Sequence, residues 1–168
     1  AKVDRISTLR PAFKSDGTIT AANASSISDG ASALVLTRES NLKGRAPLAC
    51  LVAHTTHSIH PSEFTLAPIG AIEKLLKKTG WSADSVDLFE INEAFAMVTM
   101  LTMQALNLPH EKVNIYGGAC AQGHPIGSTG SRLIVTLAHA LQQHDKQRGI
   151  AALCIGGGEA TAVALERA

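Results

Sequence analysis

Short apolar runs alternate with amphipathic stretches from residue 48 to the end of the chain, and this alternation limits the fold more than any other feature. The runs have strand length and end at turn signals, whereas the stretches between them space apolar residues as helices do. The expected strands are 48–54, 86–91, 113–116, 150–155 and 161–165, and the expected helices are 67–78, 92–106 and 128–143. The last two strands flank a glycine-rich turn, which predicts an antiparallel hairpin. The order predicts a layered α/β fold with a mixed β-sheet packed between helices.

The first 45 residues follow a different pattern. They contain few apolar residues and no sustained period, apart from the short run ASALVLT at 31–37, which is typical of a buried strand. Turn signals at 15–17 and 28–30 punctuate this region.

Composition excludes several classes of function. The 168 residues are 45% hydrophobic with a net charge of +1, which suits one well-packed domain without a nucleic-acid-binding surface. No apolar run approaches the roughly 18 residues of a membrane span, and no basic-then-apolar stretch in this sequence resembles a signal peptide. Three cysteines are an odd number in a chain of this length, so we expect free thiols and a cytoplasmic location.

Three stretches with chemically active side chains follow expected strands, where ligands bind in α/β sheets. Asn92 opens the first, and the second, GGACAQGHPIGSTGSR, holds His124 between a glycine and a proline. The third places Cys154 just before three glycines. An imidazole moves protons near neutral pH, and a thiol beside exposed glycine amides can act as nucleophile or acid/base next to an oxyanion hole.

Each of these residues also has a non-catalytic interpretation. His124 could simply hydrogen-bond the backbone of its loop, and Cys154 could be a small buried hydrophobe. Asn92 could cap a helix whose first turn contains Glu93. The histidines of HTTHSIH (54–60) are spaced by three residues, but on a strand such positions face opposite ways, so we expect no metal site.

The three stretches together indicate a family far more specifically than any one of them does. NEAFA (92–96), GGACAQGHPIGSTGSR (117–132) and CIGGGEATAVALE (154–166) resemble the C-terminal half of the thiolases, which transfer acyl groups between acyl-CoA and coenzyme A. TAANASSISDGASALVL (20–36) resembles the approach to the same region. The resemblance implies that residues 1–45 are the end of a loop region and the last strand of an N-terminal half. Residues 46–168 would then be the thiolase C-terminal domain.

The resemblance also implies catalytic roles. His124 would activate a nucleophilic cysteine and polarise the thioester oxygen. Cys154 would carry a proton to and from the α-carbon of the substrate or the departing thiol. Asn92 would hold a water in one oxyanion hole, and the amide of Gly156 would contribute to the other.

Coenzyme A is the expected ligand, as substrate and not as cofactor, and no further cofactor is implied. Its pantetheine arm is expected near Ser25, Ala94 and Phe95. The implied partners are an N-terminal thiolase half and further copies in a homo-oligomer, without nucleic acid or membrane. Neither acyl chain length nor the direction of the reaction follows from these residues.

The nucleophilic cysteine of thiolases lies in their N-terminal half. Cys50 falls in an expected strand, where we expect it to pack, and Cys120 stands where the family usually has an aliphatic residue. We therefore expect this chain alone to be inactive. The alternatives are a non-catalytic binding or assembly module with a thiolase fold, and a ketoacyl synthase relative, which the second cysteine disfavours.

Overall fold

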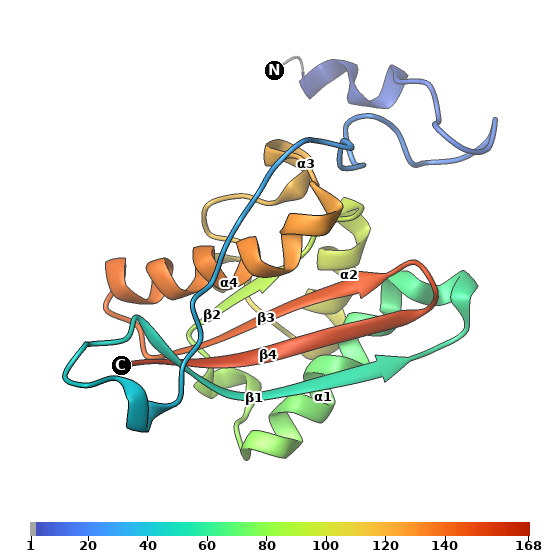
Figure 1. Ribbon diagram of the computed structural model, residues 1–168. Helices are drawn as coiled ribbons and strands as arrows, with labels where there is room; N and C mark the ends of the chain where they lie inside the picture. The colour runs from blue at the N-terminus through green and yellow to red at the C-terminus, as the bar shows by residue number, and fades with distance from the viewer. Residues whose placement is uncertain (1–2) are drawn as a thin grey trace.

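A computed structural model, which describes residues 3–168, has one four-stranded sheet flanked by helices (Figure 1). The strands are β1 (Ala49–Ser58), β2 (Leu88–Ile91), β3 (Arg148–Ile155) and β4 (Glu159–Arg167); the α-helices are α1 (Ala67–Thr79), α2 (Ala96–Leu106), α3 (Ala119–Gln122) and α4 (Ile126–Gln143). Short 3-10 turns span Val3–Thr8, Glu39–Asn41, Pro61–Leu66, Ala83–Ser85 and His110–Lys112. The strand order is β1-β4-β3-β2, with β2 and β3 parallel and the other pairs antiparallel. The predicted mixed α/β sheet and its final hairpin are confirmed.

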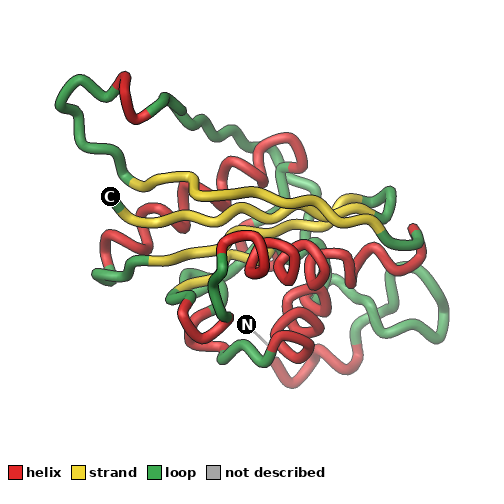
Figure 2. The backbone as a smooth tube through the Cα atoms, turned by 90° about the horizontal axis from the view of Figure 1, so that it is seen from below, coloured by secondary structure: helices red, strands yellow, loops and turns green. Residues whose placement is uncertain are grey.

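Helices lie on both sides of the sheet, as Figure 2 shows. On one face, α1 and α2 cover a cluster that includes Ile72, Phe89 and Ile150. On the other, α4 packs Leu133 and Leu137 against the strands. Alternate residues of β2, β3 and β4 therefore pack into two cores. Within residues 3–168, every helix is too short or too polar to cross a membrane.

The helix-stop signals placed the end of α1 within one residue, whereas α2 begins four residues after its predicted start. α1 ends at Thr79, where Gly80 takes up a left-handed conformation with φ of 72° and caps the helix. α4 begins at Ile126, two residues before the predicted start, because Pro125 fixes the backbone at its N-cap. This earlier start sets the helix directly against the histidine loop.

Two expected strands are absent from the part of the chain that the structure describes. Residues 31–37 form a loop in which Val35 and Leu36 are exposed, because no strand of this sheet lies beside them. Residues 113–116 make only a single bridge, between Val113 and Phe89. The pairing stops there because Asn114 is left-handed, with φ of 49°.

The hairpin turn between β3 and β4 offers a matched pair of glycines. Gly158 has φ of +98°, and a Cβ there would lie 2.4 Å from the carbonyl oxygen of Ile59. Gly156 has open space beside it. Gly158→Ala should therefore destabilise the fold by about 3 kcal/mol, and Gly156→Ala by less than about 0.5 kcal/mol. Urea unfolding of both variants tests this prediction, and equal losses of stability would contradict it.

Candidate functional site

Two of the predicted catalytic residues are in direct contact. The backbone N–H of Asn92 donates to the carbonyl of Ala152 at 2.9 Å, which continues the β2–β3 pairing past the end of β2. The side chain of Asn92 is buried, and its Nδ2 lies 3.3 Å from Nε2 of His124. The parallel pairing thus holds the asparagine where the histidine loop can reach it.

The histidine is held at three points. Its backbone N–H donates to the carbonyl of Ser26 at 2.9 Å, and its Nδ1 lies 2.6 Å from Oγ1 of Thr129, one turn into α4. The Thr129 hydroxyl donates its own hydrogen to the carbonyl of Pro125 at 3.0 Å. The hydroxyl must then accept from Nδ1–H, so that Nε2 carries the lone pair and accepts from the Asn92 amide. This tautomer presents Nε2 as the base.

The surroundings of His124 keep the ring neutral. Partial burial, and then the positive charge of Arg132 on α4, lower the pKa of His124 below its usual 6.5. A neutral imidazole at neutral pH can accept a proton without first losing one. The hydrogen bonds of His124 and its lowered pKa therefore both favour its action as a base through Nε2.

Thr129→Val should disturb this tautomer while keeping the side-chain volume. Without the hydroxyl, Nδ1–H loses its acceptor, and we expect imidazole ¹⁵N shifts of His124 to show a mixture of tautomers. Any acyl transfer that depends on the base should fall by about tenfold to a hundredfold. Thr102→Val is the matched control, since Thr102 is also buried and donates to a helix carbonyl, that of Val98. Unchanged His124 shifts in the Thr129 variant would contradict the assignment.

Cys154 lies at the end of β3, opposite Ala160 of β4, and is 8% exposed. Burial raises the pKa of its thiol, so the sulfur holds its proton at neutral pH. Within the described chain, no hydrogen bond joins Cys154 to His124 or Asn92. Its link to them is the backbone of β3, whose Ala152 accepts from Asn92. Gly156 follows in the exposed turn, with open space on its α-carbon.

The three residues expected near the pantetheine arm form one continuous contact. Ser25 donates to the carbonyl of Ala94 through both its backbone N–H, at 3.2 Å, and its hydroxyl, at 2.8 Å. Ala24 bridges to Phe95 in antiparallel fashion, and the Phe95 ring packs edge-on against Phe13. The N-terminal segment is thereby fastened beside the turn that carries Asn92.

Glu93 has a role that the sequence did not reveal. α2 begins at Ala96 and its N-cap is Phe95, so the interpretation of Asn92 as a cap and of Glu93 as a first-turn acid is wrong. Glu93 instead reaches across to the histidine loop, where its Oε2 accepts from the backbone N–H of Cys120 at 3.0 Å. A Cβ at Gly118 would lie 2.3 Å from this carboxyl carbon. Gly118 was therefore the sequence signal that a side chain passes close to this backbone.

Cys50 was expected to pack into a core, and this expectation is wrong, whereas Cys120 is partly buried. Cys50 is exposed on β1 and does not pack into a core, because β1 is the edge strand of the sheet and residues 50–52 are all exposed there. Cys120 is partly buried, and burial together with the Glu93 carboxylate raises the pKa of its thiol to about 11. Cys120 is thus a poor thiolate at neutral pH.

The histidines of HTTHSIH do not gather. His57 packs on α1, where its ring would collide with a Cβ at Gly70, whereas His54 is exposed. No group of three histidine, cysteine or acidic side chains suited to a metal occurs within residues 3–168.

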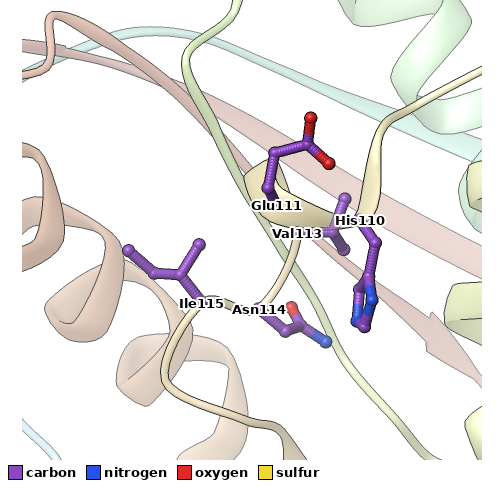
Figure 3. Close-up of a pocket in the computed structure, with 5 residues that line it drawn as sticks. All are labelled: His110, Glu111, Val113, Asn114 and Ile115. Carbon is purple, nitrogen blue, oxygen red and sulfur yellow. The ribbon is translucent and has the colours of Figure 1, made fainter.

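A shallow hollow of about 430 Å³ lies near the 3-10 turn after α2 (Figure 3). It is lined by His110, Glu111, Val113, Asn114 and Ile115. Asn114 forms one wall and also bonds the backbone of Ile91, with N–H to Oδ1 at 2.8 Å and Nδ2 to O at 2.8 Å. The lining contains none of the predicted catalytic residues, and the Asn114 side chain instead holds the end of β2 just before Asn92.

Comparison with known proteins identifies matches over the whole chain. The family model "Thiolase, C-terminal domain" matches residues 45–167, and "Thiolase, N-terminal domain" matches residues 1–40. A probable acetyl-CoA acetyltransferase of Dictyostelium discoideum is 49% identical over 98% of this chain and 40% of its own length. A probable acetyl-CoA acyltransferase of Staphylococcus aureus is 46% identical over 98% of this chain and 42% of its own length.

Solved structures agree with these matches. The crystal structure of the Bacillus anthracis acetyl-CoA acetyltransferase superposes with a TM-score of 0.96 at 42% identity, covering 98% of this chain and 42% of that one. Human mitochondrial 3-ketoacyl-CoA thiolase in complex with CoA superposes with a TM-score of 0.91 at 37% identity, covering 100% of this chain and 43% of that one. The chain spans about two fifths of the length of these relatives.

Proposed function

Because the chain belongs to the thiolase family, we propose that it supplies the proton-transfer half of a site that moves acyl groups between acyl-CoA and coenzyme A. The hydrogen-bonded series from Thr129 through His124 to Asn92 is the observation that carries this proposal. It presents a neutral imidazole with its Nε2 lone pair toward the turn at the end of β2. Relatives at 46–49% identity are named as acetyl-CoA acetyltransferase or acyltransferase, which supports this class of reaction.

The proposed steps divide among four residues. His124 takes the proton of a nucleophilic thiol, which then attacks the carbonyl carbon of the acyl substrate. Asn92, through a water that it is expected to hold, stabilises one of the oxyanions that form, and the exposed amide of Gly156 stabilises the other. When the carbon–carbon bond of a 3-ketoacyl-CoA breaks, its electron pair stays on the α-carbon, and the Cys154 thiol donates the proton that completes acetyl-CoA. The raised pKa of Cys154 supports this step, because the thiol is protonated when the step begins.

We propose that the pantetheine arm lies along the contact between Ser25, Ala94 and Phe95. These residues are partly exposed and directly follow the Asn92 turn or pair with it. An arm in this position would bring the thioester toward His124. The solved human thiolase in complex with CoA supports coenzyme A as the ligand class.

The nucleophile belongs to a partner segment in this proposal. Cys120 holds its proton up to a pKa of about 11, Cys154 is buried, and Cys50 lies exposed on β1 away from His124. We therefore infer that an N-terminal thiolase half supplies the acyl-carrying cysteine, with residues 1–45 as the end of that half and 46–168 as the C-terminal domain. Homo-oligomerisation and a cytoplasmic location stay predictions.

Acetoacetyl-CoA cleavage by coenzyme A tests the proposal. The 168-residue chain alone should give no turnover, and an added N-terminal thiolase half with a reactive cysteine should restore it. Intact mass after incubation with acetyl-CoA should show the acyl group on the added half only. A covalent acyl group on this chain would overturn the assignment of the nucleophile. Binding of coenzyme A without restored turnover would favour the non-catalytic module.

A further inference from the structure

A charged pair that the proposed reaction does not use is buried beside the histidine. Glu90 of β2 is 1% exposed, and its Oε2 lies 3.9 Å from Nη1 of Arg132 on α4. Strand alternation turns Glu90 to the α4 face of the sheet, as it does Leu88. Glu90 precedes Asn92 by two residues, and Arg132 follows Thr129 by three on the same helix. The pair therefore joins the two elements that hold His124.

This pair is poorly built for stabilising the fold. Its separation exceeds hydrogen-bonding distance, and Oε2 of Glu90 and both terminal nitrogens of Arg132 have no hydrogen-bond partner among residues 3–168. Removing two charges from water costs several kcal/mol, which only good hydrogen-bond geometry offsets. The pair therefore needs an explanation other than stability.

A second arginine–glutamate pair shows the contrast. Nε of Arg148 donates to Oε1 of Glu166 at 3.0 Å, about a third of each side chain is exposed, and the guanidinium stacks over the Trp81 ring. That pair lies on β3 and β4 and makes the contacts expected of a structural ion pair. Glu90 and Arg132 make none of them.

The charges of the buried pair act on the imidazole. An arginine keeps its charge at every pH of interest, and Arg132 lowers the pKa of His124. Burial raises the pKa of Glu90 to about 7; Arg132 opposes this rise and the Glu93 carboxylate adds to it. Asn92, Thr129 and Ser26, which hydrogen-bond His124, are neutral. Below pH 7, therefore, Glu90 becomes neutral and the arginine acts on the imidazole without a counterion.

We propose that Arg132 and Glu90 are positioning residues for His124: the guanidinium keeps the imidazole neutral, and the carboxyl, packed against the guanidinium, offsets that positive charge only while it is ionised. This inference rests on the proposed role of His124 as a base. The inference gives the charges of Glu90 and Arg132 a purpose, which is to set the pKa of His124. It also explains why the pair lies where β2 meets α4, next to the groups that hold His124.

Imidazole ¹⁵N shifts of the labelled chain, recorded from pH 4.5 to 8.5, test this assignment. A His124→Asn variant identifies the signals of His124 among the seven histidines. In the wild type we expect a main midpoint below 6.5 and a small inflection near pH 7 from the carboxyl. Arg132→Met should raise the main midpoint by about one pH unit. Glu90→Gln should remove the inflection and leave the midpoint nearly unchanged.

The control is Arg148→Met, which removes the cation of the other ion pair and should leave the His124 titration unaltered. A His124 midpoint unmoved in Arg132→Met, or an inflection that persists in Glu90→Gln, overturns the proposal. Should Arg132→Met not fold, the double variant Glu90→Gln with Arg132→Met removes both charges and should show the same raised midpoint. The titration needs no turnover. If the His124 titration is as expected but acyl transfer is absent, the proposed function is wrong and the roles of Arg132 and Glu90 still hold.

Discussion

Replacing His124 with alanine should lower acyl transfer by about 10³-fold or more when the chain is assayed with an N-terminal half that carries the nucleophile. The substitution removes the lone pair on Nε2 that is expected to take the thiol proton. The nucleophile then stays largely protonated at neutral pH, because an unperturbed thiol has a pKa near 8.5. The loss should therefore shrink as the pH rises and the thiol ionises by itself.

His139→Ala is the matched control, because His139 is exposed on the same helix, α4. It should retain wild-type rates. In the wild type, the acidic limb of the pH–rate profile should lie below 6.5, because the pKa of His124 is lowered and the ring stays a base to lower pH. A His124→Ala variant that keeps more than about a tenth of the rate would show that another group accepts the proton.

The layered fold could be predicted because its signals are local. Apolar spacing within α1, a left-handed glycine after it, and the glycine turn before β4 each act over a few residues. The strand expected at 31–37 is absent because strand formation depends on a neighbour, which a sequence pattern does not report. The expected strand at 113–116 is absent because the side chain of Asn114 bonds the backbone of Ile91 and its own backbone turns left-handed.

The candidate site shows the same difference between local signals, which a sequence carries, and contacts between distant segments, which it does not. His124, Asn92 and Cys154 could be proposed as site residues from the sequence because glycine-rich stretches and strand ends mark them, and their catalytic roles stay predictions. Their partners were not found, since each partner comes from a contact between distant segments. Glu93 reaches the amide of Cys120, and Glu90 meets Arg132 on α4 across the sheet. A charged residue inside an apolar strand was the one sequence signal for Glu90, because such residues are rarely buried without a function or a partner.

Cys154→Ala should separate the two halves of the proposed reaction. Acylation of the partner's nucleophile needs His124 and should stay within about tenfold of the wild-type rate. Proton transfer at the α-carbon needs the thiol of Cys154, and we expect it to fall by about 10³-fold. Acylation can be followed by intact mass, and proton transfer by deuterium exchange from solvent into the methyl group of acetyl-CoA.

The control for this variant is Cys50→Ala, which removes an exposed thiol on β1 and should change neither rate. Cys154 is buried opposite Ala160, and alanine at this position removes only the sulfur, which should cost about 1 kcal/mol of stability. A general loss of folding would therefore not mimic the expected pattern, since it would lower both rates together. Equal losses in acylation and exchange would assign Cys154 to the structure of the site and leave proton transfer at the α-carbon to another group.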